Sequence, residues 1–284
     1  MLTVMVSASG SPGVTSTALG LTVRWPRPVV LVEADPTGGS GILAGFFRAQ
    51  LDHPGLIDLV IAQRSDLLAD ALPRLLLPIE GTQASVLVGS RSHEQAAGIA
   101  QLWQPLLDAL RQLEPTGTDV IVDAGRLGLN GWPHHLVTGS DLTLLMVRAD
   151  LPGLAGARSW ANTLVSDDLA GGHQTRVLLV GEGRPYGRGE VGRTLGVPVL
   201  ASIEFDPASA AVYSHGRTPP PPRWWQRIGR GPDAARAAFD ASDYVRSLVA
   251  AAEAIRAVPA PQPMSPFRSV LAQAGAAAEG GTRR

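Results

Sequence analysis

Residues 4–17 read VMVSASGSPGVTST, and this stretch decides the fold that we expect for the rest of the chain. A short apolar run ends at Val6, small and turn-forming residues follow, and an alanine- and leucine-rich helical pattern begins at Thr15. This order predicts a strand, a glycine-rich loop and a helix. The backbone N–H groups of such a loop, together with the positive end of the helix, form a site suited to a phosphate group.

The loop matches the phosphate-binding pattern of a small residue, four free positions, Gly, Lys and then Ser or Thr, except at the lysine. Ala8, Gly13 and Thr15 occupy the required positions, and Val14 stands where the lysine would contact the outer phosphates. The alternative is an ordinary glycine-rich turn in an α/β protein. The pattern predicts a weak site for ATP and Mg²⁺, with the phosphate-binding residues Gly10, Ser11, Gly13, Val14, Thr15 and Ser16.

The missing lysine is not replaced by another cation within the loop. The chain contains no lysine at all, and all 24 of its Lys and Arg residues are arginine. A charge-assisted hydrogen bond contributes roughly 1.5 to 3 kcal/mol, so its loss weakens phosphate binding about 10- to 150-fold. Hydrolysis should suffer more than binding, because charge on the outer phosphate must be stabilised in the transition state.

The composition allows one large core and excludes several kinds of chemistry. With 284 residues and 45% hydrophobic content, we expect one domain over residues 1–258 and a linker with a short amphipathic tail over 259–284. The formal net charge of −1 gives no general basic field, which disfavours nucleic acid as a partner. The absence of cysteine excludes disulfides, thiolate metal sites and cysteine nucleophiles.

The expected location of the chain is the cytoplasm. The N-terminal residues lack a charged region followed by an uninterrupted apolar stretch, which a secretory signal would require. No run of about 18 apolar residues, the length needed to cross a bilayer, occurs later in the sequence.

Carboxylates follow the second predicted strand. Residues 28–33 read PVVLVE, a continuous apolar run that predicts a strand covered on both faces. Glu33 ends this run and Asp35 follows it, at the edge where open α/β sheets bind ligands. Asp35 is therefore our candidate catalytic residue, which would orient a nucleophilic water or hold the water shell of a metal ion. The alternative is a turn-forming Asp before Pro36.

Another predicted strand, over residues 118–123, also ends in a carboxylate. Residues 118–123 read TDVIVD, which places Asp123 at the same edge of the predicted sheet. An aspartate there supports magnesium through bound water, although a structural cap is the alternative. The predicted magnesium site consists of Thr15, Asp35 and Asp123.

The remaining sequence alternates between apolar runs and helical patterns. Helices are predicted over residues 55–61, 66–76, 93–113 and 151–165, and a longer amphipathic helix over 232–258. Further strands are predicted over residues 84–89, 141–147, 176–180 and 196–200. This alternation predicts an α/β fold with a mostly parallel, doubly wound sheet flanked by helices.

Over residues 1–216 the sequence resembles the ParA/MinD group of P-loop ATPases, with its elements in matching order. Ser9 and Val14 stand at the positions of the two loop lysines of that group. Glu33 and Asp35 fall on the two acidic positions of its second motif.

The resemblance continues beyond these motifs. Asp123 corresponds to the Walker B aspartate, and residues 206–216 resemble the loop that flanks the nucleotide. What the resemblance implies is a positioning or assembly factor of the SIMIBI class.

Because both lysines are absent, the resemblance favours a pseudo-ATPase scaffold or localiser with weak or no ATP hydrolysis. It is similar in this respect to the pilus-localising proteins of the TadZ/CpaE type, which implies a role at a pilus or secretion apparatus. One alternative is an active ATPase that uses Arg126, Arg148 or an arginine of a partner in place of the lysines. Another is a DNA or plasmid partition ATPase.

Two segments are candidate partner sites. Residues 218–231 read TPPPPRWWQRIGRG, where tryptophans alternate with arginines over 223–230; this suits a membrane interface or a partner groove, unless the tryptophans pack back on the domain. Residues 264–274 carry an apolar stripe after a proline-rich linker and are expected to dock on a protein partner. The resemblance leaves open a homodimer and a peripheral contact with the membrane or cell pole.

Overall fold

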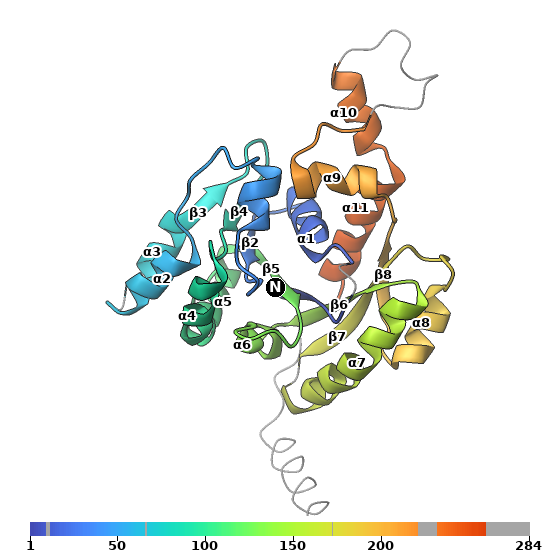
Figure 1. The fold of residues 1–284 in the computed structure, drawn as a ribbon, viewed down its shortest axis with the longest axis horizontal. Helices are drawn as coiled ribbons and strands as arrows, with labels where there is room; N and C mark the ends of the chain where they lie inside the picture. Colours follow the sequence, from blue (N-terminus) through green and yellow to red (C-terminus); the bar gives the residue numbers. More distant parts are fainter. Residues whose placement is uncertain (10–11, 66, 172, 221–231, 260–284) are drawn as a thin grey trace, which may run out of the picture.

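The computed structural model describes residues 1–9, 12–65, 67–171, 173–220 and 232–259 (Figure 1). Within these residues the chain forms an eight-stranded sheet with the strand order β3-β4-β2-β5-β1-β6-β7-β8. All neighbouring strands are parallel except β3 and β4, which are antiparallel. The strands are β1 (Leu2–Ser7), β2 (Val29–Glu33), β3 (Leu76–Pro78), β4 (Ala84–Leu87), β5 (Asp119–Arg126), β6 (Leu142–Arg148), β7 (Gln174–Val180) and β8 (Val199–Ile203).

Helices cover both faces of this sheet, which confirms the predicted α/β class (Figure 1). One hydrophobic cluster joins one face of the sheet to α2 (Leu56–Gln63), α3 (Leu68–Ala71), α4 (His93–Ile99), α5 (Trp103–Arg111), α6 (His134–Thr138), α7 (Leu151–Gly171) and α8 (Arg188–Leu195). The second cluster joins the other face to α1 (Val14–Val23), α9 (Pro207–His215), α10 (Pro232–Asp240) and α11 (Asp243–Arg256).

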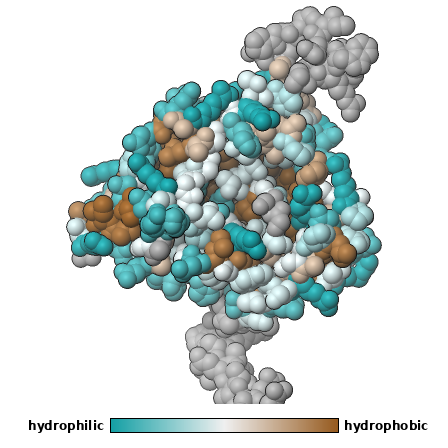
Figure 2. Space-filling model, in the orientation of Figure 1, coloured by the Kyte–Doolittle hydropathy of each residue, from teal (hydrophilic) through white to brown (hydrophobic). Residues whose placement is uncertain are grey.

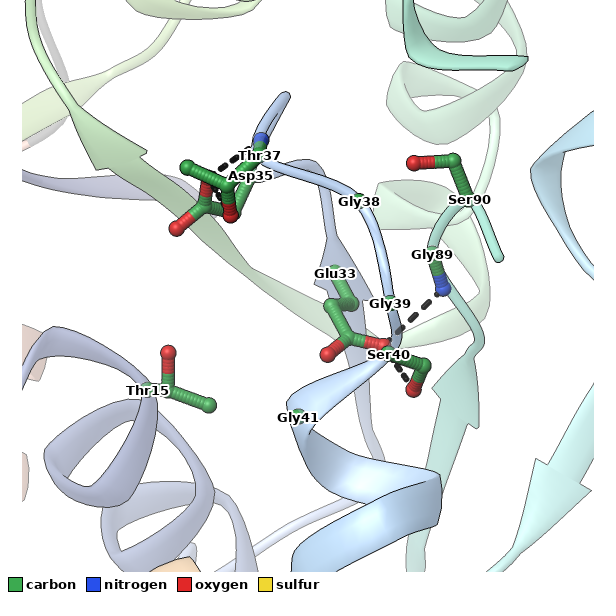
Figure 3. A pocket seen from close by; sticks show the side chains of 10 residues that line it. All are labelled: Thr15, Glu33, Asp35, Thr37, Gly38, Gly39, Ser40, Gly41, Gly89 and Ser90. Carbon is green, nitrogen blue, oxygen red and sulfur yellow. Dashed lines mark hydrogen bonds between the residues drawn. The ribbon is translucent and has the colours of Figure 1, made fainter. Parts of the chain in front are cut away.

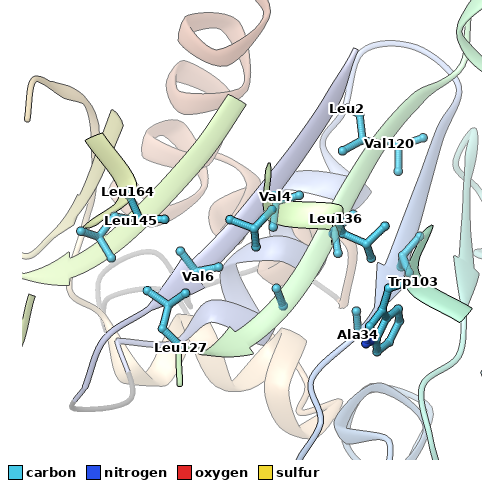
Figure 4. Close-up of a cluster of buried hydrophobic side chains, with 14 of the residues drawn as sticks. Leu2, Val4, Val6, Ala34, Trp103, Val120, Leu127, Leu136, Leu145 and Leu164 are labelled. Carbon is cyan, nitrogen blue, oxygen red and sulfur yellow. The ribbon is translucent and has the colours of Figure 1, made fainter. Parts of the chain in front are cut away.

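The central strand β1 is buried along its whole length between these layers. Side chains alternate between the two faces of a strand, so Val4 and Val6 join one cluster and Met5 joins the other. Figure 4 shows Val4 and Val6 among apolar side chains that α5, α6 and α7 contribute. Full burial of such a side chain contributes roughly 1.5 to 3 kcal/mol, so β1 is held in a fixed position.

The predicted helix over residues 93–113 is interrupted. The structure has α4, a 3₁₀ turn over Ala100–Leu102 and then α5. Pro105 explains the break, because a proline inside a continuous helix clashes with the carbonyl of the preceding turn and is tolerated only near a helix start. The predicted apolar stripe itself is confirmed, since Ile99, Leu102, Leu106, Leu107 and Leu110 are all buried.

The predicted helix over residues 66–76 is also wrong in its second half. Helix α3 gives way to a 3₁₀ turn over Leu72–Leu75, and the chain continues as the short strand β3. Pro73 near the start of that turn removes a backbone donor, which favours the tighter turn. The strand β3 then pairs antiparallel with β4 at the edge of the sheet.

Residues 206–216 do not form the expected loop but the helix α9. Asp206 caps it by accepting hydrogen bonds from the N–H groups of Ala208 at 3.0 Å and Ser209 at 3.1 Å. Pro207 at the first helical position has the backbone angle that a helix requires, and Gly216 ends the helix in a left-handed conformation. These are ordinary helix signals, which the comparison with a flanking loop overlooked.

The single helix predicted over residues 232–258 is two helices, α10 and α11. The break falls at Ser242, whose hydroxyl caps α11 by accepting from the N–H of Val245 at 3.3 Å. Serine favours such a cap over a position inside a helix, because its hydroxyl competes for backbone hydrogen bonds. The candidate partner segments 223–230 and 264–274 lie outside the described residues.

The surface is mixed, and Figure 2 shows several separate apolar areas. One of them lies at the end of the molecule formed by α2 and α3, where Ile61 and Leu67 are exposed. In the described part of the chain, no helix is long and apolar enough to cross a membrane.

Candidate functional site

The loop after β1 turns into α1 at Gly13, as the sequence pattern predicts. Gly13 has a φ of +89°, a left-handed conformation that glycine adopts without strain. No side chain caps α1 at this residue. The first N–H groups of a helix have no partner within it, and residues 14–16, which carry these groups in α1, line a cavity. The predicted phosphate residues Gly10 and Ser11 lie outside the described chain.

Asp123 lies fully buried beneath the start of α1. Its Oδ1 accepts a hydrogen bond from the N–H of Gly125 at 3.0 Å, but its Oδ2 has no partner among the described residues. Burial raises the pKa of Asp123 to about 7; the Thr15 hydroxyl lowers it in part, and the nearby charges of Asp35 and Glu33 raise it further.

This unpaired oxygen fits the predicted magnesium site. Buried polar atoms almost always have a partner, so the free Oδ2 of Asp123 indicates a place for a water or an ion. Magnesium is usually bound through one or two protein groups with waters and phosphate oxygens, not by a cage of protein ligands. The described residues contain no group of three or more histidine and acidic side chains that would hold a metal by itself.

Asp35 follows β2 and lies between the two cavities of this region. Its Oδ1 accepts hydrogen bonds from the N–H of Thr37 at 2.9 Å and from the Thr37 hydroxyl at 2.8 Å, so it does form the turn that was the alternative for this residue. It also lines both cavities, as does Thr15. The structural and the proposed catalytic roles are therefore compatible.

Glu33 has a structural role that the sequence did not reveal. Its carboxylate is buried and accepts hydrogen bonds from the N–H groups of Gly89 at 3.0 Å and Ile42 at 3.1 Å, and from the Ser40 hydroxyl. Glu33 thus ties the end of β2 to the loop after β4. These bonds occupy both of its oxygens and leave it poorly placed to act on a ligand.

Two adjoining cavities lie at the carboxyl ends of β1, β2 and β5. The larger has a volume of about 460 Å³ and is lined by the start of α1, together with Arg126, Leu129 and Ser214. The smaller, of about 140 Å³, extends between the ends of β2 and β4 and is lined mainly by glycine and small hydroxyl residues (Figure 3). Leu129 belongs to no motif in the sequence, whereas Ser214 lies within residues 206–216, which the sequence relates to a loop that flanks the nucleotide.

The two lysine positions are filled by short side chains that pack into the protein. Val14 is only 7% exposed and belongs to the hydrophobic cluster around α11. Ser9 packs against α7, where a Cβ atom added to Gly156 would lie 2.1 Å from its hydroxyl oxygen. Neither position places a cation near the loop.

The two arginines considered as substitutes differ in their surroundings. Arg126 lines the larger cavity. Arg148 does not line either cavity: its guanidinium lies 4.7 Å from the ring centre of Phe205, and its Nε lies 3.2 Å from Asp150 Oδ2. The structure thus places only the first of these two candidates at the predicted phosphate site.

The sheet order and the uncapped helix after β1 define a P-loop-type α/β fold, and solved structures of the ParA/MinD group share it. The cell division ATPase MinD of Pyrococcus furiosus matches with a TM-score of 0.64 and 18% identity, over 90% of this chain and 98% of that one. The septum site-determining protein MinD of Pyrococcus horikoshii, solved with Mg-ADP, matches with a TM-score of 0.64 and 17% identity, over 90% and 97%.

A ParA family ATPase from Chlorobium tepidum also matches, with a TM-score of 0.64 and 13% identity, over 89% of this chain and 97% of that one. No model of a known protein family and no curated protein sequence matches the chain. The chain therefore has the ParA/MinD fold over almost its full length.

Proposed function

We propose that this protein is a ParA/MinD-like positioning or assembly factor, whose nucleotide site binds Mg·ATP weakly and hydrolyses it slowly or not at all. The observation that carries the proposal is the combination at the start of α1. Gly13 is left-handed and no side chain caps the helix at this residue, which supports a phosphate-binding loop, while Val14 is buried at the position where the pattern requires a lysine.

Each remaining group has a defined role in this proposal. The N–H groups of residues 14–16 bind phosphate oxygens, and the Thr15 hydroxyl and Asp123 bind magnesium and its water shell. Asp35 orients a water molecule near the outer phosphate. Magnesium, when bound, neutralises part of the phosphate charge. The MinD of Pyrococcus horikoshii was solved with Mg-ADP, which supports these ligands for a chain of the same fold.

Slow hydrolysis follows from the missing lysines. An outer phosphate gains negative charge at its oxygens in the transition state, and a positioned cation there lowers the barrier. Ser9 and Val14 stand where the ParA/MinD group has its two loop lysines, so the loop itself does not supply this cation. The protein therefore acts through binding, as a scaffold or localiser, more than through turnover.

A second candidate function is an active ATPase with a substituted cation. The position of Arg126 in the larger cavity favours it, because this is where an arginine of the chain would meet a phosphate group. An arginine from a second copy would serve the same purpose in a homodimer.

For the proposed partner, two segments outside the described residues are our candidates: 223–230 and 264–274. An apolar helical stripe behind a linker suits a groove on a protein partner, and tryptophans beside arginines suit a membrane surface at the cell pole. The comparison supports protein partners in general, because the MinD of Aquifex aeolicus was solved in complex with MinC. We propose that the positioned structure is a pilus or secretion apparatus, because the chain resembles the pilus-localising proteins of the TadZ/CpaE type in its lack of lysines in the phosphate loop.

Titration of the purified protein with Mg·ATP, followed by thermal shift and calorimetry, tests the proposal. A ligand that binds the folded state stabilises it by RT ln(1 + [L]/Kd), so a weak site raises the melting temperature at millimolar ligand. We expect such a rise, together with ATP turnover far below that of a lysine-bearing relative. Asp123→Ala should abolish the rise.

Two results would contradict parts of this proposal. The absence of any Mg·ATP-dependent stabilisation at millimolar concentration would refute a nucleotide site. Turnover near that of ordinary ParA/MinD members, lost on Asp35→Ala, would refute the scaffold and support the active ATPase.

A further inference from the structure

The larger cavity is lined by a positively charged side chain that does not belong to the loop motif. Among the described residues that line this cavity, Arg126 is the only positively charged one. It shares the cavity with Gly13 and Thr15 of the phosphate site and with the carboxylate of Asp35. That carboxylate repels an anionic ligand, and a positively charged side chain in the same cavity offsets this repulsion.

An irregularity in β5 brings Arg126 to this place. In the pairing of β1 with β5, Met5 lies opposite Asp123 but Ser7 lies opposite Arg126. Between these pairs one residue of β1, Val6, opposes two residues of β5, so β5 carries one extra residue, as in a β-bulge. Bulges of this kind change the direction of the side chains that follow them and are common beside functional sites.

The bulge is held in place by Gly125 and Asp35. Gly125 has a φ of +63°, and a Cβ atom there would lie 2.3 Å from the Asp35 carboxylate. The hydroxyl of Ser7 donates a hydrogen bond to the Gly125 carbonyl at 3.4 Å, and the N–H of Leu127 donates to the Ser7 carbonyl at 2.8 Å. These contacts fix the chain on both sides of Arg126, so its side chain starts from a defined backbone position.

The charge of Arg126 is not used by the described protein. None of the ion pairs or side-chain hydrogen bonds among the described residues includes its guanidinium group. Arg148, by contrast, is engaged by Asp150 and Phe205. An exposed arginine with no partner among the described residues, at the cavity proposed to bind phosphate, can offer its five donors to a ligand.

We infer that Arg126 binds the phosphate groups of the nucleotide and replaces the lysine that is absent at Val14. The inference rests on the proposed nucleotide site, and it names the residue on which the affinity of that site depends. It concerns binding and holds whether or not the bound nucleotide is hydrolysed. The planar guanidinium pairs with two oxygens of one phosphate, which an ammonium group does not match.

The test compares Arg126→Gln with Arg256→Gln, a matched variant that removes the same charge elsewhere. Arg256 is exposed in the last turn of α11. The carbonyl of Pro259, just beyond α11, accepts a hydrogen bond from the side chain of Gln174, the first residue of β7. Arg256 therefore lies near the amino end of β7, whereas the cavity lies at the carboxyl ends of the parallel strands. The dissociation constants for Mg·ATP and for inorganic triphosphate with magnesium are measured by calorimetry on the full chain.

We expect Arg126→Gln to weaken both ligands about 10- to 150-fold, the loss of one charge-assisted contact. Arg256→Gln should bind as the wild type does, and Arg126→Lys should recover part of the affinity. Because Arg126 has no partner in the described chain, the melting temperature without ligand should match the wild type, which separates a lost contact from a misfolded variant.

Three results would overturn the inference. If Arg126→Gln binds both ligands with wild-type affinity, the inference about Arg126 is wrong, while the proposed nucleotide site remains intact. An equal loss in Arg256→Gln would show a general charge effect, and a loss for Mg·ATP without a loss for triphosphate would place Arg126 at the base and not at the phosphates. If the wild type binds neither ligand at millimolar concentration, the proposed function fails together with the inference.

Discussion

At the scale of single residues, Asp123 carries a free-energy cost that depends on pH. Its pKa is raised from an ordinary value of 3.8 to about 7, foremost by burial. Below pH 4 the carboxyl is protonated in both the folded and unfolded states, so folding carries no penalty. As the pH rises towards 7 the unfolded state releases the proton first, and the folded state loses stability until Asp123 is ionised in both.

We therefore predict that Asp123→Asn gains stability relative to the wild type as the pH is raised from 5 to 8. The gain is expected to be on the order of a few kcal/mol, since each pKa unit corresponds to about 1.4 kcal/mol. Chemical denaturation at both pH values, without nucleotide, measures it. Any fixed cost of the amide cancels in the comparison, and an equal difference between variant and wild type at both pH values would contradict the prediction.

Val14 is the second single residue with a testable effect, here on the affinity for Mg·ATP. A lysine there carries its ammonium group along the side-chain stem into the cavity that Val14 lines. We expect Val14→Lys to tighten Mg·ATP binding by about tenfold or more, in line with one charge-assisted contact. Calorimetry measures the change, and Val14→Met, which lengthens the side chain without a charge, is the control. Equal affinities in the two variants would show that the lysine position does not govern the site.

Ser9 differs from Val14 although both stand at lysine positions of the ParA/MinD group. Its contact with Gly156 of α7 leaves little space, because even a Cβ atom on that glycine would collide with it. A lysine at Ser9 must therefore leave this contact with α7, so restoring both lysines is expected to destabilise the protein more than Val14→Lys alone.

At the scale of elements, the bulge of β5 depends on one glycine. Gly125→Ala combines a strained left-handed backbone with a collision against Asp35. Gly117 provides a matched control, because its φ of +80° is similarly strained but a Cβ atom there would meet nothing within 4 Å. The strain alone costs roughly 1 to 2 kcal/mol.

We predict that Gly117→Ala loses about this amount in its free energy of unfolding, and that Gly125→Ala loses clearly more. Gly125→Ala should also weaken Mg·ATP binding, because it shifts Arg126, whereas Gly117→Ala should not. Denaturation and calorimetry give the two quantities. If both variants lose the same stability and bind alike, the close packing of β5 against Asp35 has no energetic role.

At the scale of the whole molecule, both core clusters, with the partly buried side chains packed against them, and all the described strands lie within residues 1–258. Pro259, the last described residue, accepts a hydrogen bond at its carbonyl from the Gln174 side chain at 2.9 Å. A single exposed hydrogen bond contributes about 1 kcal/mol or less to stability.

Removal of residues 260–284, which leaves Pro259 in place, is therefore expected to change the melting temperature by less than about 2 °C. It should also abolish capture of the protein partner, if the segment 264–274 is the docking element that we propose. Melting curves and a binding assay on the two chains measure these effects. A large fall in the melting temperature would mean that the segment packs on the domain, and the docking proposal would be wrong.

The sequence by itself determined the central part of the fold and indicated several residues of the candidate site, whose roles remain predictions. Gly13, Thr15, Asp35 and Asp123 were all identified from short motifs, because a phosphate loop and a strand-terminal carboxylate depend on residues close together in the chain. The parallel sheet was predictable for the same reason, since doubly covered strands are continuous apolar runs.

Only the tertiary structure decided how the site is charged and supported. The hydrogen bonds of Glu33, the contact between Ser9 and Gly156, and the bulge that places Arg126 in the cavity each join residues that are distant in the sequence. The helix breaks at residues 100–102 and 241–242 are a different case, because Pro105 and the capping Ser242 are local signals that the apolar stripe of each helix conceals. The contacts that join distant residues depend on the relative placement of whole elements, which local residue patterns do not encode.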